Sequence, residues 1–169
     1  MASLLPGAVL LAALGAAQLL PPAGDGDIRT VYYELQNVTD IFLLLEPRTF
    51  KGERAPIVTF TCRFPGRRHT VAPREVEVQA SAGQFWAPRA ELWFELDGRE
   101  VVNLSAPLSN APLLEGTPDY WSGRVPIDVL RRMARAQRIN GSSLGFPFEL
   151  SASQRQAIRA WLERITPQG

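Results

Sequence analysis

Arginines in two segments are the side chains whose types and spacing most readily suit ligand binding. Six basic residues lie in one turn and on one segment of helical periodicity: Arg67, Arg68, His69, Arg131, Arg135 and Arg138. Arg132 lies beside the second group. Guanidinium groups gathered on one surface bind phosphates, lipid headgroups or acidic polymers. The same spacing also suits a solvated helix face, so the sequence leaves both interpretations open.

Two aromatic pairs offer a second binding chemistry. Phe85-Trp86 precedes Pro88, and Tyr120-Trp121 lies between Pro118 and Gly123. Exposed Trp86, Tyr120 and Trp121 side chains would stack on sugar rings or anchor a protein partner. The alternative is that they close the ends of a small β core.

The sequence contains few residues suited to catalysis. The chain has one His and one Cys, which excludes by counting a multi-Cys/His zinc site and a disulfide framework within the chain. No nucleophile motif accompanies His69. The pairs Glu75/Glu77 and Glu91/Glu95 share strand faces, a geometry found in glycosidases, but surface strands commonly carry such pairs. We therefore expect a protein that is not an enzyme and needs no cofactor or metal.

Composition and charge narrow the class further. The chain has 169 residues, 46% of them hydrophobic, with 18 Lys and Arg against 17 Asp and Glu, a formal charge of +1. This length suits one globular domain, and the near-zero charge argues against a nucleic-acid partner. The apolar content excludes a disordered chain.

The N-terminal segment predicts export. Residues 1–24 carry no charged side chain, and Leu4–Leu20 form an apolar run that resembles the core of a cleaved signal peptide. The run is shorter than the about 20 residues of a spanning helix and contains Pro6. No basic residue precedes it, so a retained membrane anchor is the alternative. We expect a periplasmic or secreted mature domain over residues 25–169, with membrane contact only if the segment is retained.

The elements that must position these residues are strands first and helices last. Alternating or β-branched runs predict strands at 28–35, 41–45, 57–62, 75–79, 91–96 and 100–104, with a tight turn at Asp97-Gly98. In the third run, Cys62 shares the apolar face of Val58 and Phe60, which predicts a buried thiol.

The C-terminal part changes to helical periodicity. One helix is predicted near 127–139, stopping at Asn140-Gly141, and another near 152–165 behind a Ser151/Gln154 capping box. A short strand between them ends at Leu150, with Pro147 at an edge or bulge. The sequence therefore predicts an α+β fold, an antiparallel β-sandwich-like body with two C-terminal helices.

Three of the four asparagines begin glycosylation sequons: Asn37, Asn103 and Asn140. In a eukaryotic secretory pathway these would be surface acceptors. Asparagine also favours turns and helix ends, which gives the spacing a structural explanation.

The C-terminal segment of the chain, from Val125 onward, resembles part of other proteins. The segment Val125–Leu130, the pair Asn140-Gly141, and the run Phe146-x-Phe148-x-Leu150-Ser151-x-x-Gln154 are similar to the end of exported bacterial proteins of uncharacterised function. The resemblance covers about 45 residues. It implies a β-sandwich-like body, a helix–strand–helix tail and an export route, and it implies no reaction.

Together these observations predict a non-catalytic binding or structural module of the cell envelope. Its partner would be an envelope or extracellular protein or glycan. The alternative is an envelope-associated hydrolase acting on glycan or peptide.

Overall fold

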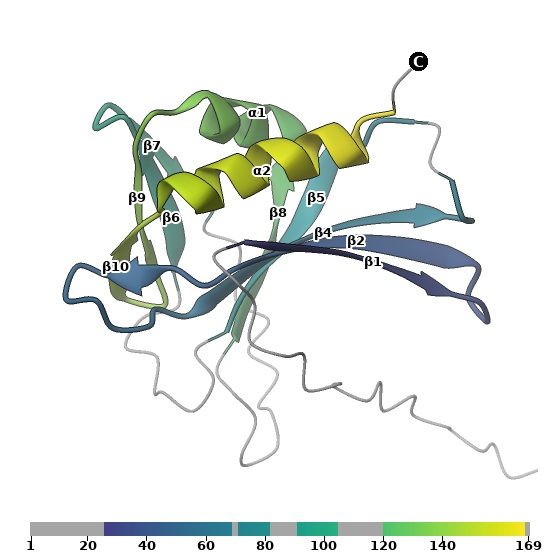
Figure 1. The fold of residues 1–169 in the computed structure, drawn as a ribbon, viewed down its shortest axis with the longest axis horizontal. Helices are drawn as coiled ribbons and strands as arrows, with labels where there is room; N and C mark the ends of the chain where they lie inside the picture. Colours follow the sequence, from purple (N-terminus) through teal and green to yellow (C-terminus); the bar gives the residue numbers. More distant parts are fainter. Residues whose placement is uncertain (1–25, 69–70, 82–90, 105–119, 168–169) are drawn as a thin grey trace, which may run out of the picture.

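Two antiparallel five-stranded sheets and two helices make up the fold (Figure 1). The computed structural model describes residues 26–68, 71–81, 91–104 and 120–167. The first sheet has the order β1 (Asp27–Tyr33), β2 (Val38–Leu45), β4 (Ile57–Pro65), β5 (Glu75–Ser81), β8 (Tyr120–Pro126). The second has the order β3 (Arg48–Thr49), β10 (Phe146–Glu149), β9 (Ile139–Ser143), β6 (Leu92–Leu96), β7 (Glu100–Asn103). The predicted α+β class is confirmed.

The strands form because their apolar residues alternate with polar ones. In β4, Val58, Phe60 and Cys62 are buried while Arg63 is exposed. Leu43 of β2 lies opposite Phe60, so both neighbours direct apolar side chains to the same face. The predicted burial of Cys62 is confirmed, with 2% of the residue exposed.

The helix α2 (Ala152–Ile165) has the predicted bounds and the predicted cap. The Ser151 Oγ accepts the Gln154 amide N–H at 3.2 Å, and the Gln154 Oε1 accepts the Ser151 N–H at 3.0 Å. The Gln154 side chain also donates to the Glu46 carbonyl at 2.9 Å. The cap therefore fixes the start of α2 against the segment that follows β2.

An aromatic chain joins α2 to both sheets. The ring centroid of Trp161 lies 6.0 Å from that of Phe60, and Phe60 lies 6.4 Å from Phe94 of the second sheet. Phe94 contacts Phe148 edge-on at 6.0 Å. All four residues are completely buried, so a single core holds the two sheets and α2 together.

The helix α1 (Ile127–Arg135) is shorter than the predicted 127–139. Ala136 is already extended, and Ile139–Ser143 form β9, which pairs with β6 and β10. Gly141 is therefore not a helix stop. Pairing with strands distant in sequence overrides the local helix signal here.

Two tight turns connect the strands of the second sheet. Asp97 and Gly98 have φ values of 53° and 66°, which confirms the predicted turn between β6 and β7. Leu144 and Gly145 form a similar turn between β9 and β10, with φ values of 53° and 85°. Pro147 is opposite Ser142, while the pairing of β10 with β3 begins only at Phe148, so its missing N–H breaks no bond to β3.

No helix in the described ranges has both the length and the apolar character needed to cross a membrane.

Candidate ligand-binding site

The two basic segments occupy different parts of the fold. Arg67 lies beyond the end of β4, where its guanidinium stacks 4.2 Å above the ring of Tyr32 and lies 3.3 Å from the Glu34 carboxylate. Arg68 is the next residue, and His69 lies outside the described residues. Arg131 and Arg135 lie on α1, which packs against β8 and α2. The structure therefore does not bring the turn and the helix together as one patch.

The predicted row on the helix is also divided. Arg131 donates to Asp128 on the preceding turn at 2.7 Å. Arg138 lies beyond the end of α1 and is 3.4 Å from Glu149 of β10. The predicted helix face does not include Arg138, because α1 ends at Arg135 and Arg138 lies beyond it.

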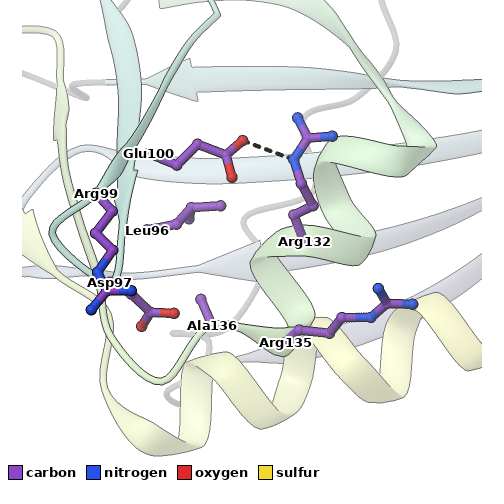
Figure 2. A pocket seen from close by; sticks show the side chains of 7 residues that line it. All are labelled: Leu96, Asp97, Arg99, Glu100, Arg132, Arg135 and Ala136. Atoms are coloured by element: carbon purple, nitrogen blue, oxygen red, sulfur yellow. Dashed lines mark hydrogen bonds and ion pairs between the residues drawn. The ribbon is translucent and has the colours of Figure 1, made fainter.

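A groove between the β6–β7 hairpin and α1 is the candidate site that includes a predicted arginine and an apolar floor (Figure 2). Its volume is about 310 Å³. Leu96 and Ala136 are buried and form its apolar part. The residues that line it come from both elements: Leu96, Asp97, Arg99, Glu100, Arg132, Arg135 and Ala136. We call this site the hairpin–helix groove.

Both carboxylates of the groove are already engaged. Asp97 Oδ1 accepts the backbone N–H groups of Gln137 and Arg138, each at 2.8 Å. Glu100 accepts from the Nε of Arg132 at 2.8 Å (Figure 2). The groove is therefore lined by three arginines and two carboxylates, and both carboxylates already accept hydrogen bonds.

The two remaining arginines of the groove find no partner among the described residues. Arg99 and Arg135 make no side-chain hydrogen bond or ion pair with any other residue of the described ranges. Figure 2 shows Arg99 on the hairpin side and Arg135 on the helix side, with the Arg135 side chain extending away from the hairpin. Sequence reasoning found Arg135 and missed Arg99, because only the fold of the hairpin brings Arg99 to the helix.

Asp97 holds the groove in shape, and its replacement is a testable prediction. We expect Asp97→Ala to lower the free energy of unfolding by about 2 kcal/mol, because it removes two hydrogen bonds and leaves alanine at a positive φ. Asp97→Asn is the matched control, since asparagine tolerates this φ and keeps an acceptor oxygen. Urea denaturation of both variants measures the difference. Equal stability of the two variants would contradict the assigned role.

The structure describes two of the three aromatic candidates, Tyr120 and Trp121. Trp121 lies in β8, opposite Ala80 of β5, and is completely buried. Of the two roles that the sequence allowed, Trp121 therefore has the core-closing one and not the exposed stacking one, because β8 directs alternate side chains into the core. Tyr120 opens the same strand. Trp86 lies outside the described residues.

Three carboxylates of the Glu75/Glu77 and Glu91/Glu95 pairs have polar partners, on two different sheets. Glu75 bonds Arg124 at 2.7 Å, and Glu77 accepts from Gln79 at 2.7 Å. Glu91 accepts from Ser142 at 3.3 Å on the other sheet. Across the described residues, no three His, Cys, Asp or Glu side chains are grouped to hold a metal ion.

The three sequons have different surroundings. Asn37 is exposed in the β1–β2 turn with a φ of 49°, and Asn103 is exposed at the end of β7. Asn140 lies in the central strand β9, where its Oδ1 is buried and finds no donor in the described part of the chain. The folded chain therefore presents the first two asparagines and encloses the third.

Cys62 is unsuited to nucleophilic chemistry. Burial, with a smaller contribution from the charge of Asp40, raises the pKa of its thiol from 9.0 to about 11. A thiol attacks only as the thiolate, so we expect no alkylation of the folded chain at pH 8.

The same pKa shift predicts a pH dependence of stability. The unfolded chain ionises Cys62 at a lower pH than the folded chain, so its contribution is complete below pH 9 and lost as the pH approaches 11. Two pKa units correspond to about 3 kcal/mol in full, of which about 2 kcal/mol is lost by pH 11. We expect this extra loss in the wild type compared with Cys62→Ala, measured by urea denaturation from pH 8 to 11. Parallel pH profiles would contradict it.

Comparison with protein-family models, with curated proteins and with solved structures finds no match to this chain.

Proposed function

We propose that this chain is an exported, non-catalytic binding module of the bacterial cell envelope, periplasmic or secreted. Its ligand is an anionic group of an envelope or extracellular protein or glycan, held in the hairpin–helix groove. The observation that carries this proposal is that two guanidiniums, Arg99 and Arg135, have no partner in the described part of the chain and lie beside a groove whose carboxylates are engaged.

The chemistry of the groove favours a carboxylate ligand. Guanidinium groups bind carboxylates through charge-assisted hydrogen bonds, and the apolar part at Leu96 and Ala136 suits a ring or an aliphatic stem. The groove volume of about 310 Å³ lies at the small end of ligand sites. A uronic acid residue or a glutamate side chain of a partner has both features.

The described carboxylates support binding rather than hydrolysis. A glycosidase needs two carboxylates across one substrate position, about 5 to 10 Å apart. Here Glu75 is paired with Arg124 on the first sheet, and Glu91 bonds Ser142 on the second. This arrangement is the reason for preferring a binding module over the hydrolase.

Binding is tested with trigalacturonic acid and a glutamate octapeptide as probes. We expect both to bind the mature chain at low salt, more weakly as salt screens the charges. The double variant Arg99→Gln/Arg135→Gln is expected to raise the Kd at least about tenfold, since each lost charge-assisted contact contributes about 1 kcal/mol. Isothermal titration calorimetry measures the change.

Arg164→Gln is the matched control. Arg164 is exposed in the last turn of α2, outside the groove. Unchanged affinity in this control with a loss in the double variant supports the groove. Equal binding by the double variant and the wild type would contradict it.

Export is tested by the intact mass of the protein recovered from its native host under non-reducing conditions. A mass short by about the first 17 to 24 residues supports a cleaved signal peptide. A full-length mass would instead favour the retained anchor. Added glycan mass would contradict the bacterial envelope assignment.

A further inference from the structure

Within the described residues, strand β1 forms one long edge of the first sheet with no strand beside it. It pairs along all seven residues with β2, and no described strand pairs with its other side. Both edge strands of the second sheet are shorter, with two residues in β3 and four in β7. The fourth edge strand, β8, contains Gly123 and ends in Pro126, which weaken it as a pairing template.

The edge of β1 lacks the features that usually prevent edge-to-edge pairing. Such features are prolines, lysines, bulges and unpaired charges. The sequence of β1 is Asp-Ile-Arg-Thr-Val-Tyr-Tyr, and its register with β2 is continuous. Its two charged residues, Arg29 and Asp27, form an ion pair with each other, so the edge is neutral. Val31 and Tyr33 remain 37% and 38% exposed.

We propose that β1 pairs antiparallel with β1 of a second copy of this chain, around a two-fold axis at Thr30. Thr30 is the middle residue of Asp27–Tyr33, so this register alone pairs all seven residues. A one-residue slip would leave one residue of each strand unpaired and would put the buried faces of the two first sheets on opposite sides of the joined sheet. Centring the axis on Arg29 would place two arginines directly opposite each other, which is repulsive.

The proposed register brings favourable side chains together. Thr30 faces Thr30 of the partner subunit, and Ile28 faces Tyr32 of the partner subunit. Threonine pairs and pairs of aromatic with β-branched residues are stabilising across antiparallel strands. Asp27 faces Tyr33 of the partner subunit, whose hydroxyl is a donor for the carboxylate. An isologous contact of this kind closes as a dimer and joins the two first sheets into one continuous sheet.

The oligomeric state tests this proposal directly. We expect sedimentation equilibrium of the mature chain at tens of micromolar to give twice the chain mass. Thr30→Lys places two like charges at the axis and is expected to raise the dissociation constant at least tenfold. Thr30 is exposed, so this variant should fold. Val101→Lys is the matched control, because Val101 is 66% exposed on β7 of the other sheet.

Engineered cysteines test the register. Thr30→Cys is expected to form a disulfide-linked dimer on mild oxidation. Arg29→Cys and Val31→Cys chains should cross-link with each other when mixed, and each should cross-link poorly with itself. The native Cys62 is buried and should not contribute.

A monomer at 100 micromolar would overturn the proposal. A dimer unaffected by Thr30→Lys would also overturn it, because the contact would then lie elsewhere. Cross-linking of Val31→Cys with itself rather than with Arg29→Cys would overturn the register. None of these outcomes depends on the groove, so the dimer and the proposed function fail or stand separately.

Discussion

Replacing Trp161 with alanine is expected to lower the free energy of unfolding by about 3 to 5 kcal/mol. Trp161 is completely buried and its ring contacts Phe60 at 6.0 Å between centroids. Its Nε1 donates to the Ile41 carbonyl at 3.2 Å, so the variant leaves a cavity and removes a hydrogen bond in the core. Urea denaturation followed by circular dichroism measures the loss.

Two further variants separate the causes of this loss. Trp161→Phe keeps an aromatic ring but not the donor, and should cost about 1 to 3 kcal/mol less than Trp161→Ala. Phe50→Ala, at a side chain that is largely exposed, should change stability by less than about 0.5 kcal/mol. A loss under 1 kcal/mol in Trp161→Ala would contradict the placement of α2 on the first sheet.

Gly141→Ala is expected to cost about 2 to 3 kcal/mol, although it adds a single methyl group. A Cβ at Gly141 would lie 2.6 Å from the Trp93 carbonyl oxygen and 2.8 Å from the Phe148 ring. The first contact is with backbone in the central pairing of β6 and β9, so a side-chain rotation does not relieve it.

Ser142→Ala is the control for Gly141→Ala. It changes the neighbouring residue of β9 and removes only the 3.3 Å bond to Glu91, so it should cost less than about 1.5 kcal/mol. Denaturant midpoints of the two variants measure the contrast. A Gly141→Ala variant as stable as the wild type would contradict the close approach of β9 and the Phe148 ring.

Gly141 also shows why the sequence predicted some elements and not others. The α2 cap depends on Ser151 and Gln154, three residues apart, so a local pattern was enough to predict it. Glycine is needed at position 141 because a Cβ there would collide with the backbone of Trp93, which is distant in the sequence. Local reasoning assigned Asn140-Gly141 to a helix end, because this pair is common there.

Strand β8 was missed for a similar reason. Its polar centre, Ser122-Gly123-Arg124, resembles a loop. The spacing of Trp121 and Val125, both completely buried, was the signal for a strand, but the turn residues on either side obscured it. Without that strand, the sequence left Trp121 open between an exposed role and a core role.

Of the two arginines proposed to bind the ligand, the sequence predicted Arg135 but not Arg99. Helical spacing placed Arg135 on a solvent face, and the structure confirms that position. Arg99 was not recognised, since the Asp97-Gly98 turn and the hydrogen bonds from Gln137 and Arg138 to Asp97 are needed to bring it beside α1. Those bonds join residues about 40 positions apart.

The central claim is that an anionic group binds between the β6–β7 hairpin and α1. An amide-resolved NMR titration of the mature chain with trigalacturonic acid tests it most directly. We expect shifts confined to residues 96–100 and 132–136, which weaken as salt is added. Shifts centred on Arg67 and Arg68, or no shifts at low salt, would contradict it.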